Sequence, residues 1–112
     1  STSDIPKGLD IRTEERAGTT RMFLAGELDL ATAPRVESKL RLAQGSHHSV
    51  VVDLQDLTFM DSHGILTFID AARRAIDAGD AFRVVNTHGT VSRVFELTHQ
   101  QVLLGGQDRH RP

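Results

Sequence analysis

Cysteine, tyrosine and tryptophan are absent from this chain of 112 residues. Without cysteine it can form neither a disulfide framework nor a thiolate metal site, which suits a reducing cytosol. Lysine occurs only as Lys7 and Lys39, and the formal net charge is -2, so the dense positive charge that binds nucleic-acid phosphates is lacking. Neither tyrosine nor tryptophan is available to stack on bases. We therefore expect no nucleic acid among the partners.

Long hydrophobic segments are also absent. The apolar run Val50–Val52 ends in an aspartate, and no run approaches the roughly 20 residues that a membrane helix needs. Residues 1–7 lack the apolar core of a signal peptide. The chain contains no phosphate-binding G-x-x-x-x-G-K-S/T loop, so autonomous nucleotide hydrolysis is not expected. These absences favour a cytoplasmic protein that makes no contact with a membrane.

What is present indicates one small globular domain. A chain of this length, with 38% hydrophobic and 25% charged residues, can bury a single core but leaves no room for a second domain. We expect a flexible leader over residues 1–8, one domain over residues 9–104 and a flexible tail over residues 105–112.

Hydrophobic periodicity predicts the element order β-β-α-β-α-β-α. Alternating residues over 9–14 and 20–28 indicate a hairpin. The continuous apolar run over 49–54 is typical of a central strand covered on both faces, followed by a loop over 55–60, and 81–85 is a further strand. Strands that alternate with helices after a hairpin predict an α/β fold, with helices packed on a mixed, mostly parallel sheet.

The helices are located by their caps and apolar spacing. Thr32 is a reasonable N-cap for a first helix that ends at Gly45, and Thr90 for a last one. A central helix runs from Ser62 to Ala78. Its predicted buried face comprises Ile65, Phe68, Ile69, Ala72 and Ile76. A short final element is possible over 102–104.

Three motifs stand in order along the chain. Residues 50–64 read VVVDLQDLTFMDSHG, an apolar strand followed by an aspartate, a short loop and Asp-Ser-x-Gly at the start of a helix. Gly-Glu-Leu-Asp over 26–29 precedes the first helix, and Arg-Val-Phe-Glu-Leu-Thr over 93–98 lies in the last. Together these motifs resemble the STAS domain family over about residues 9–104. The ordered set is far more specific than the Asp-Ser-x-Gly tetrad alone.

The resemblance implies a regulatory protein of the anti-sigma-factor antagonist class, with no catalysis, cofactor or metal of its own. Such proteins bind an anti-sigma factor and thereby release a sigma factor for transcription. The implied partner is an anti-sigma factor that is also a serine kinase. Its phosphorylation of Ser62 would break the complex, and a serine phosphatase would reset the switch.

The resemblance also implies which residues surround the phosphorylated serine. Ser62 matches the phosphoacceptor, Asp61 the preceding carboxylate, Gly64 the glycine, and Asp29 an acidic residue that lies near the serine. His63 occupies a position where many relatives carry a second serine or threonine. The expected partner-binding residues are Asp29, Thr32, Asp61, His63, Gly64 and Leu66.

Elementary chemistry supports a switch at this position. A helix start offers free N–H groups and a positive dipole end, which can accommodate an added anion. Phosphorylation adds about -1.5 to -2 charges, and a partner docked around a neutral hydroxyl would have to desolvate them. Helical geometry places Leu66 outside the buried face, one turn beyond Ser62. Leu66 is therefore either an exposed anchor for the partner or a leucine half-covered by a neighbouring loop, and Ser62 could instead be a plain N-cap.

Other chemistries fit less well. Asp61, Ser62 and His63 are the three residue types of a hydrolytic triad, but a triad requires spatial convergence rather than adjacency, and Met60 breaks the G-x-S-x-G pattern. Asp53 is expected to end a strand as a phosphoaccepting aspartate does in receiver domains, yet their late lysine is missing, so we expect Asp53 to anchor the following loop instead. Adjacent histidines at 47 and 48 rarely bind a metal alone.

Two further functions remain open for the same fold. One is a non-phosphorylated accessory subunit of a lipid-transport complex, and the other is a small-molecule or nucleotide-sensing module. Only a phosphorylation switch predicts that Ser62→Asp abolishes partner binding while Ser62→Ala preserves it.

Overall fold

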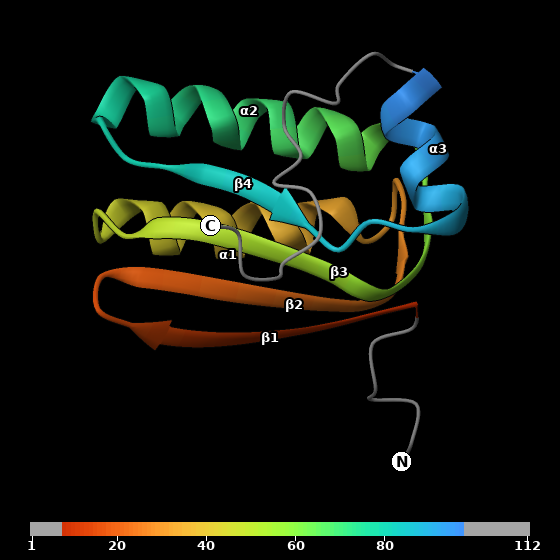
Figure 1. Ribbon diagram of the computed structural model, residues 1–112, viewed down its shortest axis with the longest axis horizontal. Helices are drawn as coiled ribbons and strands as arrows, with labels where there is room; N and C mark the ends of the chain where they lie inside the picture. Colours follow the sequence, from red (N-terminus) through yellow and green to blue (C-terminus); the bar gives the residue numbers. More distant parts are fainter. Residues whose placement is uncertain (1–7, 98–112) are drawn as a thin grey trace, which may run out of the picture.

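The computed structural model describes residues 8–97, which form a four-stranded mixed sheet and three helices (Figure 1). The strands are β1 (Leu9–Arg16), β2 (Thr19–Leu28), β3 (Ser49–Met60) and β4 (Phe82–Val85). The helices are α1 (Ala33–Gly45), α2 (Ser62–Ala78) and α3 (Gly89–Leu97). This order confirms the prediction. Residues 1–7, the predicted tail and the possible element at 102–104 lie outside the described residues.

The sheet has the order β1-β2-β3-β4, with β1 antiparallel to β2 and the other neighbours parallel. A two-residue turn, Ala17-Gly18, joins β1 to β2, and both residues have positive φ, at 53° and 79°. This geometry suits the right-handed twist of a hairpin and fixes its register from Leu9↔Gly26 to Arg16↔Thr19.

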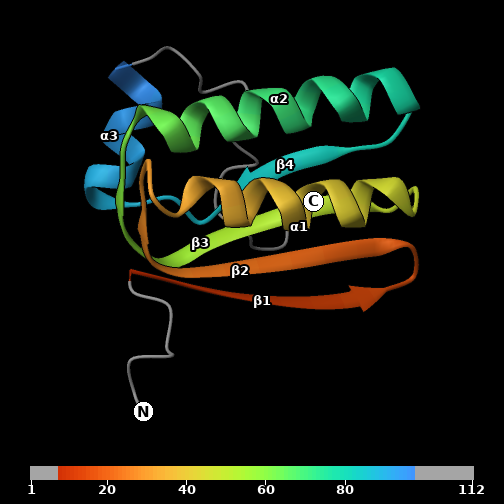
Figure 2. The ribbon, with the colours of Figure 1, turned by 180° about the vertical axis from the view of Figure 1, so that it is seen from behind.

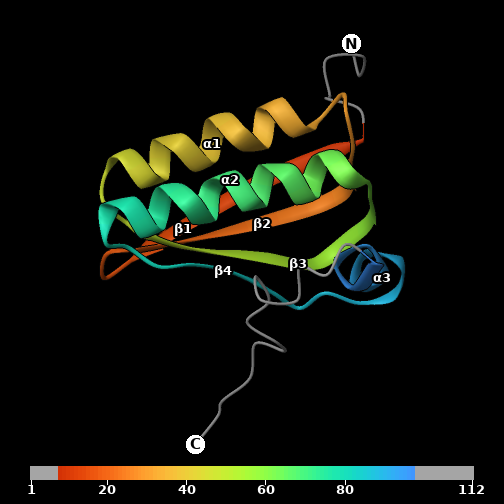
Figure 3. The same cartoon turned by 90° about the horizontal axis from the view of Figure 1, so that it is seen from above.

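Helices α1 and α2 cover one face of the sheet (Figures 2 and 3). Alternate strand residues such as Met22, Leu24, Val50 and Val52 point into the core between these layers, together with Phe68 of α2. No described helix covers the opposite face, so the expected burial of β3 on both faces has a different cause. On the open face the buried Val51 lies between Arg21 of β2 and Arg83 of β4, and the buried Asp53 is bonded by Arg21. None of the helices within residues 8–97 is long and apolar enough to span a bilayer.

Strand β3 is longer than predicted, because the expected loop over 55–60 continues the strand to Met60. Its pairing with β2 contains register shifts between Phe23 and Ala25 and between Gly26 and Glu27. Such bulges interrupt the alternation of buried and exposed residues along a strand. Residues 55–60 therefore lack the regular pattern that predicts a strand, and their sequence is typical of a loop.

Asp53 stabilises the first of these irregularities. Its Oδ1 accepts the Gln55 N–H at 2.9 Å and the Asn86 side-chain amide at 3.2 Å, and its Oδ2 accepts Arg21 Nη2 at 2.7 Å. Burial alone would raise the pKa of Asp53, but the bonds from Arg21, Gln55 and Asn86 outweigh burial and lower it below 3.8. Asp53 therefore anchors the residues that follow it, as expected, but these residues continue β3 rather than form the expected loop.

The bounds predicted for α2 are confirmed, and Gly79 ends it in the left-handed conformation with φ of 76°. One residue of its predicted buried face is wrong, because Ile76 is 76% exposed. In the last turn of α2 the buried residue is Ala75. Phe68, Ala71 and Ala75 are spaced by three and four residues and therefore share one face of the helix. Helix α3 begins at Gly89, one residue before the predicted cap Thr90.

Candidate functional site

The N-terminus of α2 is held by Asp61 rather than by the serine that follows it. The Asp61 Oδ1 accepts the His63 N–H at 2.8 Å, and the Asp61 N–H donates to the Leu28 carbonyl at 3.1 Å. Asp61 is thus the N-cap of α2, and the alternative in which Ser62 serves only as the cap is wrong. This arrangement leaves the Ser62 hydroxyl without a structural task.

Ser62 is the first residue of α2 and is exposed. Among residues 8–97 its hydroxyl has no hydrogen-bond partner. The first turn of a helix carries N–H groups without intrahelical partners, and the helix dipole places partial positive charge there. The hydroxyl is therefore accessible to a second protein, and an anion added to it would meet a favourable local field.

The loop that leads into α1 is organised by Asp29 and Thr32. The Asp29 Oδ1 accepts the N–H groups of Ala31 and Thr32 at 3.0 and 3.1 Å. Thr32 Oγ1 accepts the Asp29 N–H and donates to the Glu27 carbonyl, both at 2.9 Å. Thr32 occupies the N-cap position of α1, but its side chain does not cap the helix, so that part of the prediction is wrong. Its hydroxyl closes the preceding loop instead.

The Asp29 and Asp61 loops follow neighbouring parallel strands and lie side by side (Figure 2). The last pair of those strands is Leu28↔Met60. Gly64 packs against both strand ends, because a Cβ at this position would lie 2.6 Å from Met60 Cγ and 2.9 Å from Leu28 Cδ2. Gly64 and Thr32 are buried, so any part they take in partner binding is indirect.

A groove of about 490 Å³ lies between α1 and α2 beside Ser62. It is lined by Leu30, Ala33, Pro34, Glu37, Ser38, His63, Leu66, Thr67 and Asp70. Leu66 is 56% exposed, which confirms its predicted position outside the buried face, and its role as an anchor stays a prediction; Leu30 is 67% exposed. The sequence analysis did not single out Leu30. Its signal was an apolar residue in the short loop between Asp29 and Thr32, outside any helical stripe.

His63 lies at the end of this groove, with its Nδ1 3.3 Å from Asp61 Oδ1. It therefore faces the capping carboxylate, and among the described residues no hydrogen bond joins its ring to the Ser62 hydroxyl. Ser62 is thus not paired with a general base within the described residues, as a catalytic nucleophile would be. The adjacent histidines His47 and His48 contact different residues. His48 Nδ1 lies 2.9 Å from Thr20 Oγ1, whereas His47 Nδ1 lies 3.9 Å from Asp80 Oδ2.

Comparisons with known proteins converge on one family. The family model described as "STAS domain" matches residues 10–104. The anti-sigma-B factor antagonist of Listeria monocytogenes is 31% identical over 78 residues, which cover 69% of this chain and 68% of that protein.

Two solved structures share the fold. An anti-sigma factor antagonist from Mycobacterium paratuberculosis has a TM-score of 0.81 at 22% identity, covering 93% of this chain and 89% of the other. The Bacillus cell fate determinant SpoIIAA, solved in its phosphorylated form, has a TM-score of 0.71 at 19% identity, covering 89% and 93%.

Proposed function

Because this chain belongs to the STAS domain family, we propose that it is an anti-sigma-factor antagonist that binds an anti-sigma factor and so frees a sigma factor in the cytoplasm. The names of its relatives support this role. The observation that carries the proposal is the exposed residue Ser62, whose hydroxyl has no hydrogen-bond partner among residues 8–97 and whose neighbour His63 lines an apolar groove.

In this proposal the partner docks over the first turn of α2 and the adjacent groove. Leu30 and Leu66 provide apolar anchors, since exposed apolar side chains that gather at a groove mark sites of protein–protein interaction. Asp29 and Asp61 fix the shape of the two loops that frame Ser62. The protein contributes a docking surface and a phosphoacceptor, and the partner contributes the kinase chemistry.

Phosphorylation of Ser62 would break this complex without refolding the protein. The new dianion would stand beside the Asp61 carboxylate, where an interface built around a neutral hydroxyl would have to desolvate it. A loss of about 3 kcal/mol in binding free energy lowers affinity by roughly a hundredfold. A serine phosphatase would return the protein to its binding form. The phosphorylated state of the structural neighbour SpoIIAA supports this assignment by analogy.

The proposal is tested with the purified chain, an anti-sigma factor with kinase activity from the same cells, and ATP. Mass spectrometry is expected to locate one phosphate on Ser62. Ser62→Ala should retain binding, whereas Ser62→Asp should weaken it by about a hundredfold. Ser46→Asp, at the exposed far end of α1, is the matched control and should bind normally.

Binding that survives Ser62→Asp, or phosphate at another residue, would reject the switch at Ser62. Co-purification with transporter components would instead indicate the accessory-subunit role, and a tightly bound nucleotide would indicate a sensor.

A further inference from the structure

Strand β1 forms one edge of the sheet, and within residues 8–97 its only neighbour is β2. The Gly8 carbonyl accepts the N–H of Glu27, the residue opposite it. Antiparallel pairs alternate between residues that exchange hydrogen bonds and residues that do not. The peptide groups that face β2 are therefore those of Asp10, Arg12, Glu14 and Arg16. Those that face away from the sheet belong to Leu9, Ile11, Thr13 and Glu15.

Two further contacts agree with this alternation. Arg16 and Thr19 close a two-residue hairpin, in which the closing residues form a hydrogen-bonded pair. The outward-facing Leu9 carbonyl accepts a bond of 2.9 Å from Arg35 Nη1 on α1. The free edge is thus capped at its first residue. Ile11, Thr13 and Glu15 remain as hydrogen-bonding positions without a partner among the described residues.

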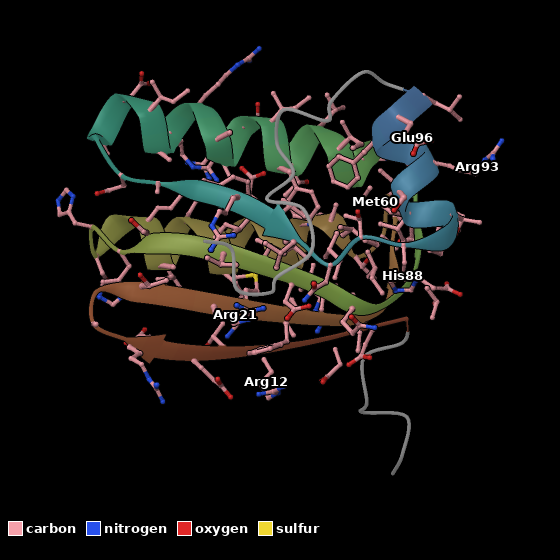
Figure 4. The ribbon with its side chains drawn as sticks, viewed as in Figure 1. Arg12, Arg21, Met60, His88, Arg93 and Glu96 are labelled. Carbon is pink, nitrogen blue, oxygen red and sulfur yellow. The ribbon has the colours of Figure 1, made fainter. Side chains whose placement is uncertain are left out.

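The side chains between these positions alternate in charge. Because Leu9 and Ile11 of β1 face the core, the residues that alternate with them, Asp10, Arg12, Glu14 and Arg16, lie on the open face of the sheet. There Arg12 lies over the Phe23 ring at 4.1 Å (Figure 4). This sequence of signs is complementary to itself when it is read in the reverse direction. An antiparallel pair of two such strands can therefore match every charge with its opposite.

We propose that two copies of this chain associate through their β1 strands, antiparallel and with Thr13 opposite the partner's Thr13. This two-fold arrangement places Asp10 opposite the partner's Arg16, and Arg12 opposite the partner's Glu14. A shift by one step in either direction would place two Arg12 or two Glu14 side chains face to face, which is unfavourable. The charge pattern thus selects one register.

The same register satisfies the free backbone groups. Thr13 pairs with the partner's Thr13, and Ile11 pairs with the partner's Glu15. The edge thereby gains about six main-chain hydrogen bonds across the two-fold axis. The charged side chains fall at the non-hydrogen-bonded pairs, where facing side chains lie closer together. The two sheets become one continuous eight-stranded sheet.

Apolar side chains beside the edge favour the same contact. A groove of about 420 Å³ runs between β1 and α1, lined by Asp10, Ile11, Arg35, Ser38, Lys39 and Leu42. Leu42 is 72% exposed although it lies on a helix that packs on the sheet. A second copy that extends the sheet would shield part of Ile11 and Leu42 from water. Because α2 and β1 are the outermost elements on opposite sides of the molecule (Figures 1 and 2), the Ser62 region stays accessible.

The interface is small and rich in ion pairs, so the dimer should be weak and sensitive to salt. Sedimentation velocity over a concentration series at low ionic strength is expected to show a monomer–dimer equilibrium. Arg12→Glu and Glu14→Arg should each weaken the dimer at least tenfold, because each places like charges opposite one another. The double variant Arg12→Glu/Glu14→Arg restores opposite pairs and should restore dimerisation. Unchanged dimerisation in both single variants would overturn the proposal.

Cross-linking tests the register directly, because the chain has no cysteine of its own. Thr13→Cys places the two Cα atoms about 5.5 Å apart, within the range of a disulfide. Glu15→Cys separates them by about 14 Å and should not cross-link. Rapid oxidation to a dimer at position 13 alone is the expected result. A protein that stays monomeric at the highest soluble concentration, or equal cross-linking at both positions, would show that β1 does not pair in this way.

Discussion

At the scale of single residues, substitutions of Leu30 and Leu66 distinguish an effect on partner binding from an effect on the stability of the fold. Both leucines are exposed and line the groove beside Ser62, so their removal deletes little buried surface. We expect Leu66→Ala or Leu30→Ala to reduce affinity for the anti-sigma partner by about tenfold or more, a loss of about 1.4 kcal/mol or more. The free energy of unfolding should change by less than about 1 kcal/mol.

Ile76→Ala is the matched control for both leucines. Ile76 is an exposed apolar residue on the same helix, but it lies about four turns from Ser62 and outside the groove. It should leave both affinity and stability nearly unchanged when measured by calorimetric titration and urea unfolding. A large stability loss in Leu66→Ala with normal affinity would identify Leu66 as part of the core.

Asp53 gives a residue-scale prediction about pH. Its pKa is lowered in the folded protein, so the stabilisation that it contributes is present above its ordinary pKa of 3.8 and is lost as pH falls through the folded value. Asp53→Asn should lower the free energy of unfolding at pH 7 by about 1–3 kcal/mol, because it removes the ion pair with Arg21 and weakens its hydrogen bonds. The difference between the two proteins should narrow below about pH 3.8. Urea unfolding at pH 7 and pH 3 measures both values, and an equal difference at the two pH values would contradict this explanation.

The sequence predicted individual candidate site residues when chemistry or helical geometry singled them out. Ser62 and Asp61 stood in a recognisable motif, and the position of Leu66 followed from the helical angle to Ile65. Leu30 and the true role of Thr32 were not predictable in this way, because both depend on how a short loop folds back on Glu27 and Asp29.

At the scale of secondary-structure elements, the packing of α2 onto the strand ends depends on Gly64. An added methyl group would overlap Met60 and Leu28, and such overpacking costs about 1–3 kcal/mol. This cost exceeds the gain of about 1 kcal/mol that alanine brings to a helix interior. Gly64→Ala is therefore expected to be destabilising in urea unfolding.

Gly45→Ala is the control, since Gly45 ends α1 and nothing lies within 4 Å of a Cβ at that position. This variant should be neutral or slightly stabilising. Equal effects at Gly45 and Gly64 would show that the close approach at Gly64 is relieved without cost.

The elements with regular periodicity were predicted from the sequence with nearly correct bounds. The hairpin, α1, α2 and β4 each carry a local signal in the form of alternation, helical spacing, Pro34 or a terminal glycine. The second half of β3 was missed because its register shifts against β2 are set by a neighbouring strand and by the bonds of Asp53. Local patterns cannot report a bulge whose cause is distant in sequence.

At the scale of the whole molecule, the proposed partner-binding groove and the proposed dimerisation edge lie apart. The groove and the N-terminus of α2 lie where α1 and α2 begin. The self-complementary β1 strand lies at the edge of the sheet opposite β4, and α2 packs on β3 and β4 (Figure 1). A dimer formed through the β1 strands would therefore leave the groove and Ser62 of both copies exposed. The helix-covered face was foreseeable from alternating patterns, whereas the open face was not, because buried residues such as Val51 and Asp53 gave β3 the composition of a strand covered by helices on both sides.

The central claim is that a single phosphate on Ser62 decides whether the partner binds. The direct measurement is a calorimetric titration of the anti-sigma factor with this protein, before and after stoichiometric phosphorylation of Ser62 verified by mass spectrometry. We expect tight binding by the unmodified protein and affinity at least a hundredfold lower after phosphorylation, with an unchanged circular dichroism spectrum. Equal affinity in the two states would contradict the switch.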